Sequence, residues 1–256
     1  MRAPEFWQLS QPNWQATALR PLGAVYAKAT ERRLARGSRL RLNIPVVCVG
    51  EINAIGTFRR PALIAVVEHL RELDHEPHVV TRGYGGTLDG PVRVNLARHT
   101  AAQVGDETVP LAAFAEVWVA KDRAEGAQAA HDAGASVIVM DGGFQNPALA
   151  YDLSIVVVDA KKGFGNGLCL PAGPLREPLS VGLARADLLL SIGAPDVQDK
   201  FALTPLPPNL PQARATLESA QVVLSATTAL QVRLKFAEEN TLFKKLSQLR
   251  QPTNLS

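Results

Sequence analysis

The chain has 256 residues, of which 46% are hydrophobic and 20% charged, a composition typical of globular proteins and a length that allows one large domain. Its two cysteines cannot form a disulfide framework, and neither lies in a spacing typical of a zinc site. Eight basic and two acidic residues lie in 1–41, so this segment carries +6 and the remainder −3. This asymmetry argues against a protein that binds nucleic acid over its whole surface.

The first 41 residues predict a basic, amphipathic helical segment in which Pro21 interrupts the helix. Aromatic residues followed by arginines are typical of a helix in the interface of an anionic membrane. A helix packed on the protein body with a solvated basic face is the alternative. Binding of nucleic acid is a weaker hypothesis, and we expect none. The apolar side chains at roughly helical spacing are Trp7, Trp14, Leu19, Leu22, Val25 and Tyr26.

From residue 44 onward, short apolar runs alternate with helical patterns. Continuous apolar runs are typical of strands buried on both faces, so the alternation predicts an α/β fold with a doubly wound, mostly parallel sheet. No apolar run is long enough to cross a membrane, and we expect an intracellular protein without a signal peptide. Strands are expected at 44–49, 77–81, 117–120, 136–140, 153–158 and 187–192, and helices at 62–73 and 123–133.

The C-terminal part of the chain gives weaker signals. Residues 205–211 are rich in proline and predict a linker. Residues 212–256 predict two further strands or helices, with a short amphipathic stripe formed by Leu242, Phe243, Leu246 and Leu249.

Ligands of such folds bind at the carboxyl ends of the strands. The loop 50–61 lies between the first strand and a helix, the position of a phosphate-binding loop, yet it lacks the Gly-Lys-Ser/Thr ending. Judged as a bare pattern, the loop fails this test and predicts an ordinary βα turn. Asp141 ends an apolar strand, where a carboxylate holds magnesium or caps a turn. A rigid Pro/Gly segment at 170–178 is typical of a functional loop.

Taken together, these segments resemble the tetraacyldisaccharide 4′-kinase family, from residue 3 to about residue 193. Several distinctive motifs occur in the same order as in that family. They are APEFW at 3–7, PLGAVYA at 21–27, IPVVCVG at 44–50, TRGYGG at 81–86, VGDE at 104–107, DGGFQNPALAYDLSIVVVDA at 141–160 and GFGNGLCLPAGPLREP at 163–178.

The resemblance implies a sheet of the P-loop NTPase type and transfer of the ATP γ-phosphate, with Mg²⁺, to the 4′-hydroxyl of a lipid A disaccharide precursor. It also implies a peripheral protein at the cytoplasmic face of the bacterial inner membrane. We accordingly expect a membrane-associating segment at 1–41, a P-loop-like kinase domain at 42–195, and a linker with a divergent, truncated C-terminal lobe at 196–256. The sequence indicates no protein partner.

The resemblance also assigns site residues. Asp106 matches the catalytic carboxylate that orients or deprotonates the sugar hydroxyl, and Asp141 matches the acid near magnesium. The remaining residues expected around the reaction are Arg82, Gln145, Arg176 and Glu177. Those matching the nucleotide-binding loop are Gly56, Thr57, Phe58, Arg59 and Arg60.

The chain departs from the family pattern within this site. The family loop reads Gly-Gly-Thr-Gly-Lys-Thr, whereas residues 55–60 read Ile-Gly-Thr-Phe-Arg-Arg, and Gly142 replaces a second aspartate. Arg60 replaces the hydroxyl expected to bind magnesium, and no histidine follows His131, although the family's C-terminal lobe carries one. A catalytically inactive, membrane-associated homologue is therefore the alternative to an active kinase.

Overall fold

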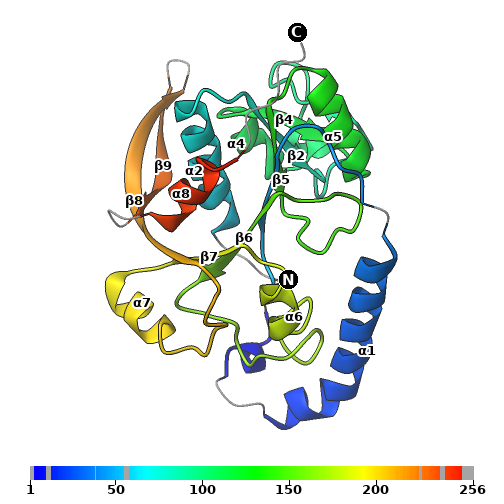
Figure 1. The fold of residues 1–256 in the computed structure, drawn as a ribbon, viewed down its shortest axis with the longest axis vertical. Coiled ribbons are helices and arrows are strands. Elements are labelled where there is room, and N and C mark those ends of the chain that lie inside the picture. Colours follow the sequence, from blue (N-terminus) through cyan, green and yellow to red (C-terminus); the bar gives the residue numbers. More distant parts are fainter. Residues whose placement is uncertain are drawn as a thin grey trace.

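The structure is a computed structural model that describes residues 3–9, 13–37, 39–54, 58–224, 227–236 and 240–249. Its centre is a nine-stranded sheet of order β3-β4-β2-β5-β1-β6-β7-β8-β9, parallel except for the two edge strands β3 and β9 (Figure 1). The strands are β1 Val46–Gly50, β2 Pro77–Thr81, β3 Val92–Arg93, β4 Glu116–Val119, β5 Val137–Asp141, β6 Leu153–Asp159, β7 Leu188–Ile192, β8 Gln212–Leu224 and β9 Thr227–Phe236.

Helices connect these strands and cover the sheet on both faces. The helical elements are η1 Glu5–Gln8, α1 Trp14–Arg36, α2 Arg59–Glu72, α3 Ala101–Val104, α4 Thr108–Ala112, α5 Arg123–Asp132, α6 Leu179–Leu183, α7 Pro195–Phe201 and α8 Thr241–Leu246. The predicted doubly wound fold is confirmed, and each of the six predicted strands is present with bounds shifted by at most two residues.

The strand sequences explain why both faces are covered. Val47 and Val49 of β1 face a core cluster that contains residues of α2 and α8, whereas Val46 and Cys48 face a second cluster with residues of α5 and α6. Because successive side chains of a strand point to opposite faces, a strand with helices on both sides buries the side chain at every position, and most of these side chains are apolar. The central strands are accordingly buried throughout.

The order of the strands reverses at β1. Strands β2 to β5 lie on one side of β1 in the sheet, and strands β6 to β9 lie on the other. β1 itself therefore lies between β5 and β6. Such a switch point leaves a crevice outside the carboxyl end of the central strand. The loop 51–58 and the turn after Asp141 both begin at this edge.

The N-terminal segment differs from its prediction in two respects. Helix α1 continues through Pro21 without a break, because loss of a single backbone donor leaves the hydrogen bonds on either side of it. Trp7 does not belong to this helix: it lies in η1, is buried, and donates a hydrogen bond from Nε1 to the carbonyl oxygen of Pro171 at 3.0 Å. The motif at 3–7 therefore packs against the Pro/Gly segment.

The C-terminal strands extend the main sheet. β8 pairs in parallel with β7, and β9 returns antiparallel to β8. Leu242 and Leu246 of α8 are fully buried in the core cluster that contains α2, with Phe243 and Leu249 packed against it, as the amphipathic stripe predicted. The division of the chain at residues 41 and 195 stays a prediction, although β8 lies in the same sheet as β7.

Candidate active site

The altered loop leads directly into helix α2. Gly56 and Thr57, which we predicted to bind nucleotide, lie outside the described residues. Phe58 is the N-cap of α2 without a side-chain cap hydrogen bond, and its ring packs partly buried against the core. The apolar side chain that replaces a family glycine thus turns inward, and Arg59 and Arg60 form the first turn of the helix.

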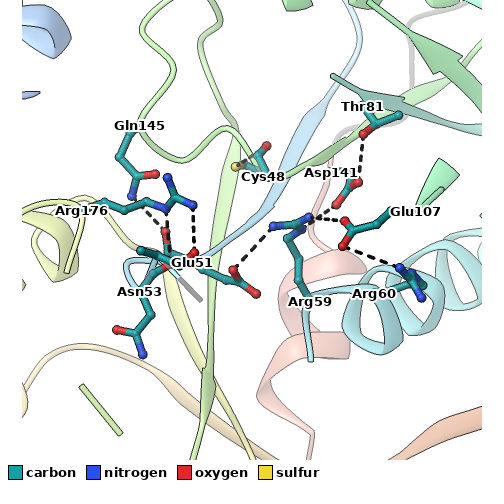
Figure 2. A network of polar contacts seen from close by, with 12 residues as sticks. Cys48, Glu51, Asn53, Arg59, Arg60, Thr81, Glu107, Asp141, Gln145 and Arg176 are labelled. Atoms are coloured by element: carbon teal, nitrogen blue, oxygen red, sulfur yellow. Dashed lines mark hydrogen bonds and ion pairs between the residues drawn. The ribbon is translucent and has the colours of Figure 1, made fainter. Parts of the chain in front are cut away.

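Arg59 points into a group of three carboxylates (Figure 2). Its Nε lies 2.7 Å from Asp141 Oδ1, its Nη2 3.3 Å from Glu107 Oε2, and its Nη1 3.5 Å from Glu51 Oε2. Arg60 Nη2 lies 3.9 Å from the other oxygen of Glu107. Burial lowers the pKa of Arg59, but the three carboxylates more than offset this effect and the pKa is raised above its ordinary value.

Both carboxylate oxygens of Asp141 are engaged within the protein. Oδ1 accepts from Arg59, and Oδ2 accepts from the Thr81 hydroxyl at 3.0 Å. Glu51 is also buried, and burial raises its pKa despite the opposing charge of Arg59. The guanidinium is therefore the main counter-ion for acidic groups that come from the ends of β1 and β5.

The turns that carry the motifs VGDE and TRGYGG are packed together. Gly105 has φ +93°, and a Cβ at this position would lie 2.6 Å from the carbonyl oxygen of Tyr84. Only glycine allows this contact between the turn 104–107 and the turn 82–86. Asp106 and Arg82 are both exposed on these turns, and Glu107, next to Asp106, contacts Arg59.

A second polar network, formed by Glu177, Arg185 and Gln145, adjoins the site at Glu51. Glu177 is 1% exposed, and both of its carboxylate oxygens lie 2.6 Å from Nη2 of Arg185. Gln145 Nε2 donates to Glu177 Oε1 and to the carbonyl oxygen of Glu51, each at 2.9 Å. The network thereby connects the segment 170–178 to the turn after β5 and to the end of β1.

Arg176 holds the loop itself (Figure 2). Its guanidinium donates to the carbonyl oxygens of Asn53 at 3.3 Å and Ala54 at 3.2 Å, and its backbone N–H donates to that of Ile52. The structure therefore brings together the predicted residues Arg59, Arg60, Asp141, Gln145, Arg176 and Glu177, with Asp106 on a turn adjoining Glu107.

Behind the site, buried groups fix the turn after β5. The Tyr151 hydroxyl donates to the carbonyl oxygen of Gly143 at 2.8 Å, and Arg123 Nη1 lies 2.3 Å from where a Gly143 Cβ would be. Burial lowers the pKa of Arg123 and raises that of the Cys48 thiol to about 12, so the thiol is protonated at neutral pH. Cys48 is therefore a packing residue, as expected from the sequence.

Sequence reasoning missed Glu51 and Arg185. Glu51 directly follows a buried strand, the same signal that singled out Asp141, and could have been found by it. Arg185 lies in a turn between α6 and β7 with no motif of its own, and it is recognised only by its contact with Glu177.

The residues around Asp141 do not fit the magnesium ion that we expected there. A divalent ion bound to Oδ1 would displace or closely approach the guanidinium of Arg59, which lies at hydrogen-bond distance from that oxygen. Arg60 offers no hydroxyl. Among the residues the structure describes, there is also no group of three or more His, Cys, Asp or Glu side chains placed to hold a metal ion.

The fold and the polar site at the switch point define a doubly wound α/β protein of the P-loop NTPase type. LpxK from Aquifex aeolicus, solved in complex with ATP, has the same fold, with a TM-score of 0.68 and 24% identity over 80% of this chain and 66% of that chain. A family model described as Tetraacyldisaccharide-1-P 4′-kinase matches residues 15–247. The chain belongs to the tetraacyldisaccharide 4′-kinase family.

Two curated relatives agree with this assignment. The tetraacyldisaccharide 4′-kinase of Dinoroseobacter shibae is 56% identical over 225 residues, covering 86% of this chain and 67% of that protein. The corresponding protein of Jannaschia sp. is 54% identical over 204 residues, covering 80% of this chain and 62% of that protein. The chain thus spans about two thirds or less of the length of such relatives.

Proposed function

We propose that the chain transfers the γ-phosphate of ATP to the 4′-hydroxyl of a tetraacyldisaccharide 1-phosphate. The observation that carries this proposal is the convergence of four family segments at the carboxyl edge of the sheet: the β1–α2 loop and the segments 104–107, 141–145 and 170–178. Family membership and the ATP bound to the Aquifex aeolicus protein support ATP as the donor.

Each residue has a role that follows from its position. Arg59 and Arg60, at the first turn of α2, supply positive charge for phosphates next to a helix N-terminus. Arg176 fixes the loop carbonyls, so that the backbone approaching the nucleotide is held in place. Asp106, exposed beside Glu107, is the carboxylate available to orient the sugar hydroxyl and accept its proton.

Replacing Asp106 with asparagine is expected to lower the rate of phosphoryl transfer about 10²–10⁴-fold, the range for loss of a positioned acid or base. The assay measures radiolabelled phosphate transfer from ATP to tetraacyldisaccharide 1-phosphate in mixed micelles. Asp199→Asn is the matched control, because Asp199 is exposed and paired only loosely with Arg214 at 3.8 Å. No transfer by the unmodified chain would support an inactive homologue, and equal rates in both variants would contradict the role of Asp106.

For the lipid substrate, we propose that α1 lies against an anionic membrane surface, at the cytoplasmic face of the bacterial inner membrane. The stripe of α1 that faces the protein is made mostly of small residues, Ala16, Gly23 and Thr30. Leu34 is also buried, whereas the apolar side chains of Trp14, Leu22 and Val25 are exposed, at 77%, 56% and 68%. Within the described residues, no helix is long and apolar enough to cross a membrane.

The double substitution Trp14→Ala and Val25→Ala is expected to weaken binding to phosphatidylglycerol vesicles at least several-fold, since both side chains lose apolar contact with the bilayer. Co-sedimentation with anionic and with phosphatidylcholine vesicles measures this effect. Leu96→Ala, which removes a half-exposed leucine far from α1 in the sequence, serves as the control. Equal sedimentation of all variants would exclude α1 as the membrane contact. In a separate binding measurement, association of the chain with duplex DNA would support the nucleic-acid hypothesis instead.

A further inference from the structure

The cation at the centre of the site belongs to the protein itself. The guanidinium of Arg59 contacts carboxylates from three separate segments: Glu51 after β1, Glu107 before α4 and Asp141 at the end of β5 (Figure 2). Its side chain is 28% exposed, while those of Glu51 and Asp141 are 7% and 5% exposed. A buried carboxylate needs a counter-charge, and here one arginine provides it for both.

Among the described residues, no other side chain nearby competes with Arg59 for the position beside Asp141 Oδ1. Position 142 carries no side chain, and a Cβ built there would lie 3.7 Å from Arg59 Cζ, so the guanidinium lies beside the residue at which the family has its second acid. The second oxygen of Asp141 is taken by the Thr81 hydroxyl. A divalent ion on Asp141 would therefore have to compete with a fixed positive charge for the same oxygen.

We propose that the Arg59 guanidinium takes the place of a divalent cation at Asp141, so that magnesium does not strengthen nucleotide binding by this chain. The proposal rests on the proposed function in one respect, namely that the nucleotide is ATP. The triphosphate then meets arginine side chains rather than a bound metal ion. Because arginine is charged at every physiological pH, the site keeps this cation when no metal is present.

The test compares the dissociation constant of ATP in EDTA with that in magnesium, by isothermal titration calorimetry. We expect a ratio of about one for the unmodified chain and for the control Arg214→Gln, which loses only a surface ion pair. Arg59→Gln releases Asp141 and is expected to make ATP bind about tenfold more tightly in magnesium than in EDTA. A tenfold ratio in the unmodified chain, or a ratio of one in Arg59→Gln, would overturn the proposal.

Binding of Mn²⁺ alone separates this proposal from the proposed function. Electron paramagnetic resonance is expected to show Mn²⁺ bound to the Arg59→Gln variant. The double variant Arg59→Gln, Asp141→Asn is expected to lose this binding, and the unmodified chain is expected to bind no Mn²⁺ through Asp141. If the unmodified chain binds Mn²⁺ through Asp141, or if Arg59→Gln gains no Mn²⁺ binding, the proposal fails whether or not ATP binds. Absence of ATP binding under all conditions would instead contradict the proposed kinase function and the magnesium-free binding that rests on it.

Discussion

Replacing Arg185 with methionine is expected to lower the free energy of unfolding by about 3–5 kcal/mol, the cost of leaving a buried charge without its partner. The orphaned group is Glu177, which is almost fully buried and whose two oxygens both contact Arg185. Arg185 also donates to the carbonyl oxygen of Phe144 at 3.0 Å, so the turn after β5 loses a hydrogen bond as well. Urea unfolding followed by circular dichroism measures the change.

The control for Arg185→Met is Arg233→Met. Arg233 also forms a short ion pair, 2.8 Å from Glu68, but both side chains are substantially exposed, so the expected loss is about 1 kcal/mol or less. In the double variant with Glu177→Gln, part of the stability lost in Arg185→Met is expected to return, because the uncompensated charge is gone. A loss in Arg185→Met no larger than in the control would show that the pair does not hold this part of the fold.

Truncating Phe144 to alanine is expected to cost about 3–5 kcal/mol, the range for a large aromatic side chain removed from a packed core. Phe144 is 1% exposed, and the guanidinium carbon of Arg185 lies 4.4 Å above the centre of its ring. Its Cβ also packs so closely on β1 that a side chain at Gly50 would approach it to 2.6 Å. The measurement is again the free energy of unfolding, with Phe144→Leu expected to lose less.

A double-mutant cycle tests whether Phe144 and Arg185 act together. Because the ring and the guanidinium are in contact, the losses caused by Phe144→Ala and Arg185→Met are expected to be non-additive by about 0.5–3 kcal/mol. Additive losses would contradict a shared network. Non-additive losses would show that the turn after β5, which carries Gln145, depends on Arg185 for its stability.

The central strands were predictable because the residues within each strand segment already indicate burial. Residues 46–49 of β1 and 137–140 of β5 are continuous apolar runs, and such runs occur where helices cover both faces of a sheet. The type of β8 and β9 was left open between strand and helix, although residues 230–236 alternate strictly between apolar and polar side chains, a period that indicates a strand. β8 is a strand because β7 offers it a parallel edge, which is a property of the folded protein.

The short helices α3, α4, α6 and α7 were missed for a related reason. Each has seven residues or fewer, too short for an isolated helix to be stable or for a period to be read. Their stability comes from packing, as for Phe201 at the end of α7, whose ring contacts that of Phe164 with centroids 5.9 Å apart.

The sequence by itself determined the class of fold, the family, and the edge of the sheet at which the site lies, because buried strands, glycine turns and strand-terminal acids are local signals. Only the tertiary structure decided the partners of Arg59. Glu107 and Asp141 are 48 and 82 residues away along the chain, and only the fold brings the turn before α4 and the end of β5 to one guanidinium. From the sequence, Arg59 is only a positively charged residue. The fold places three carboxylates around it, and this arrangement makes it the cation of the site.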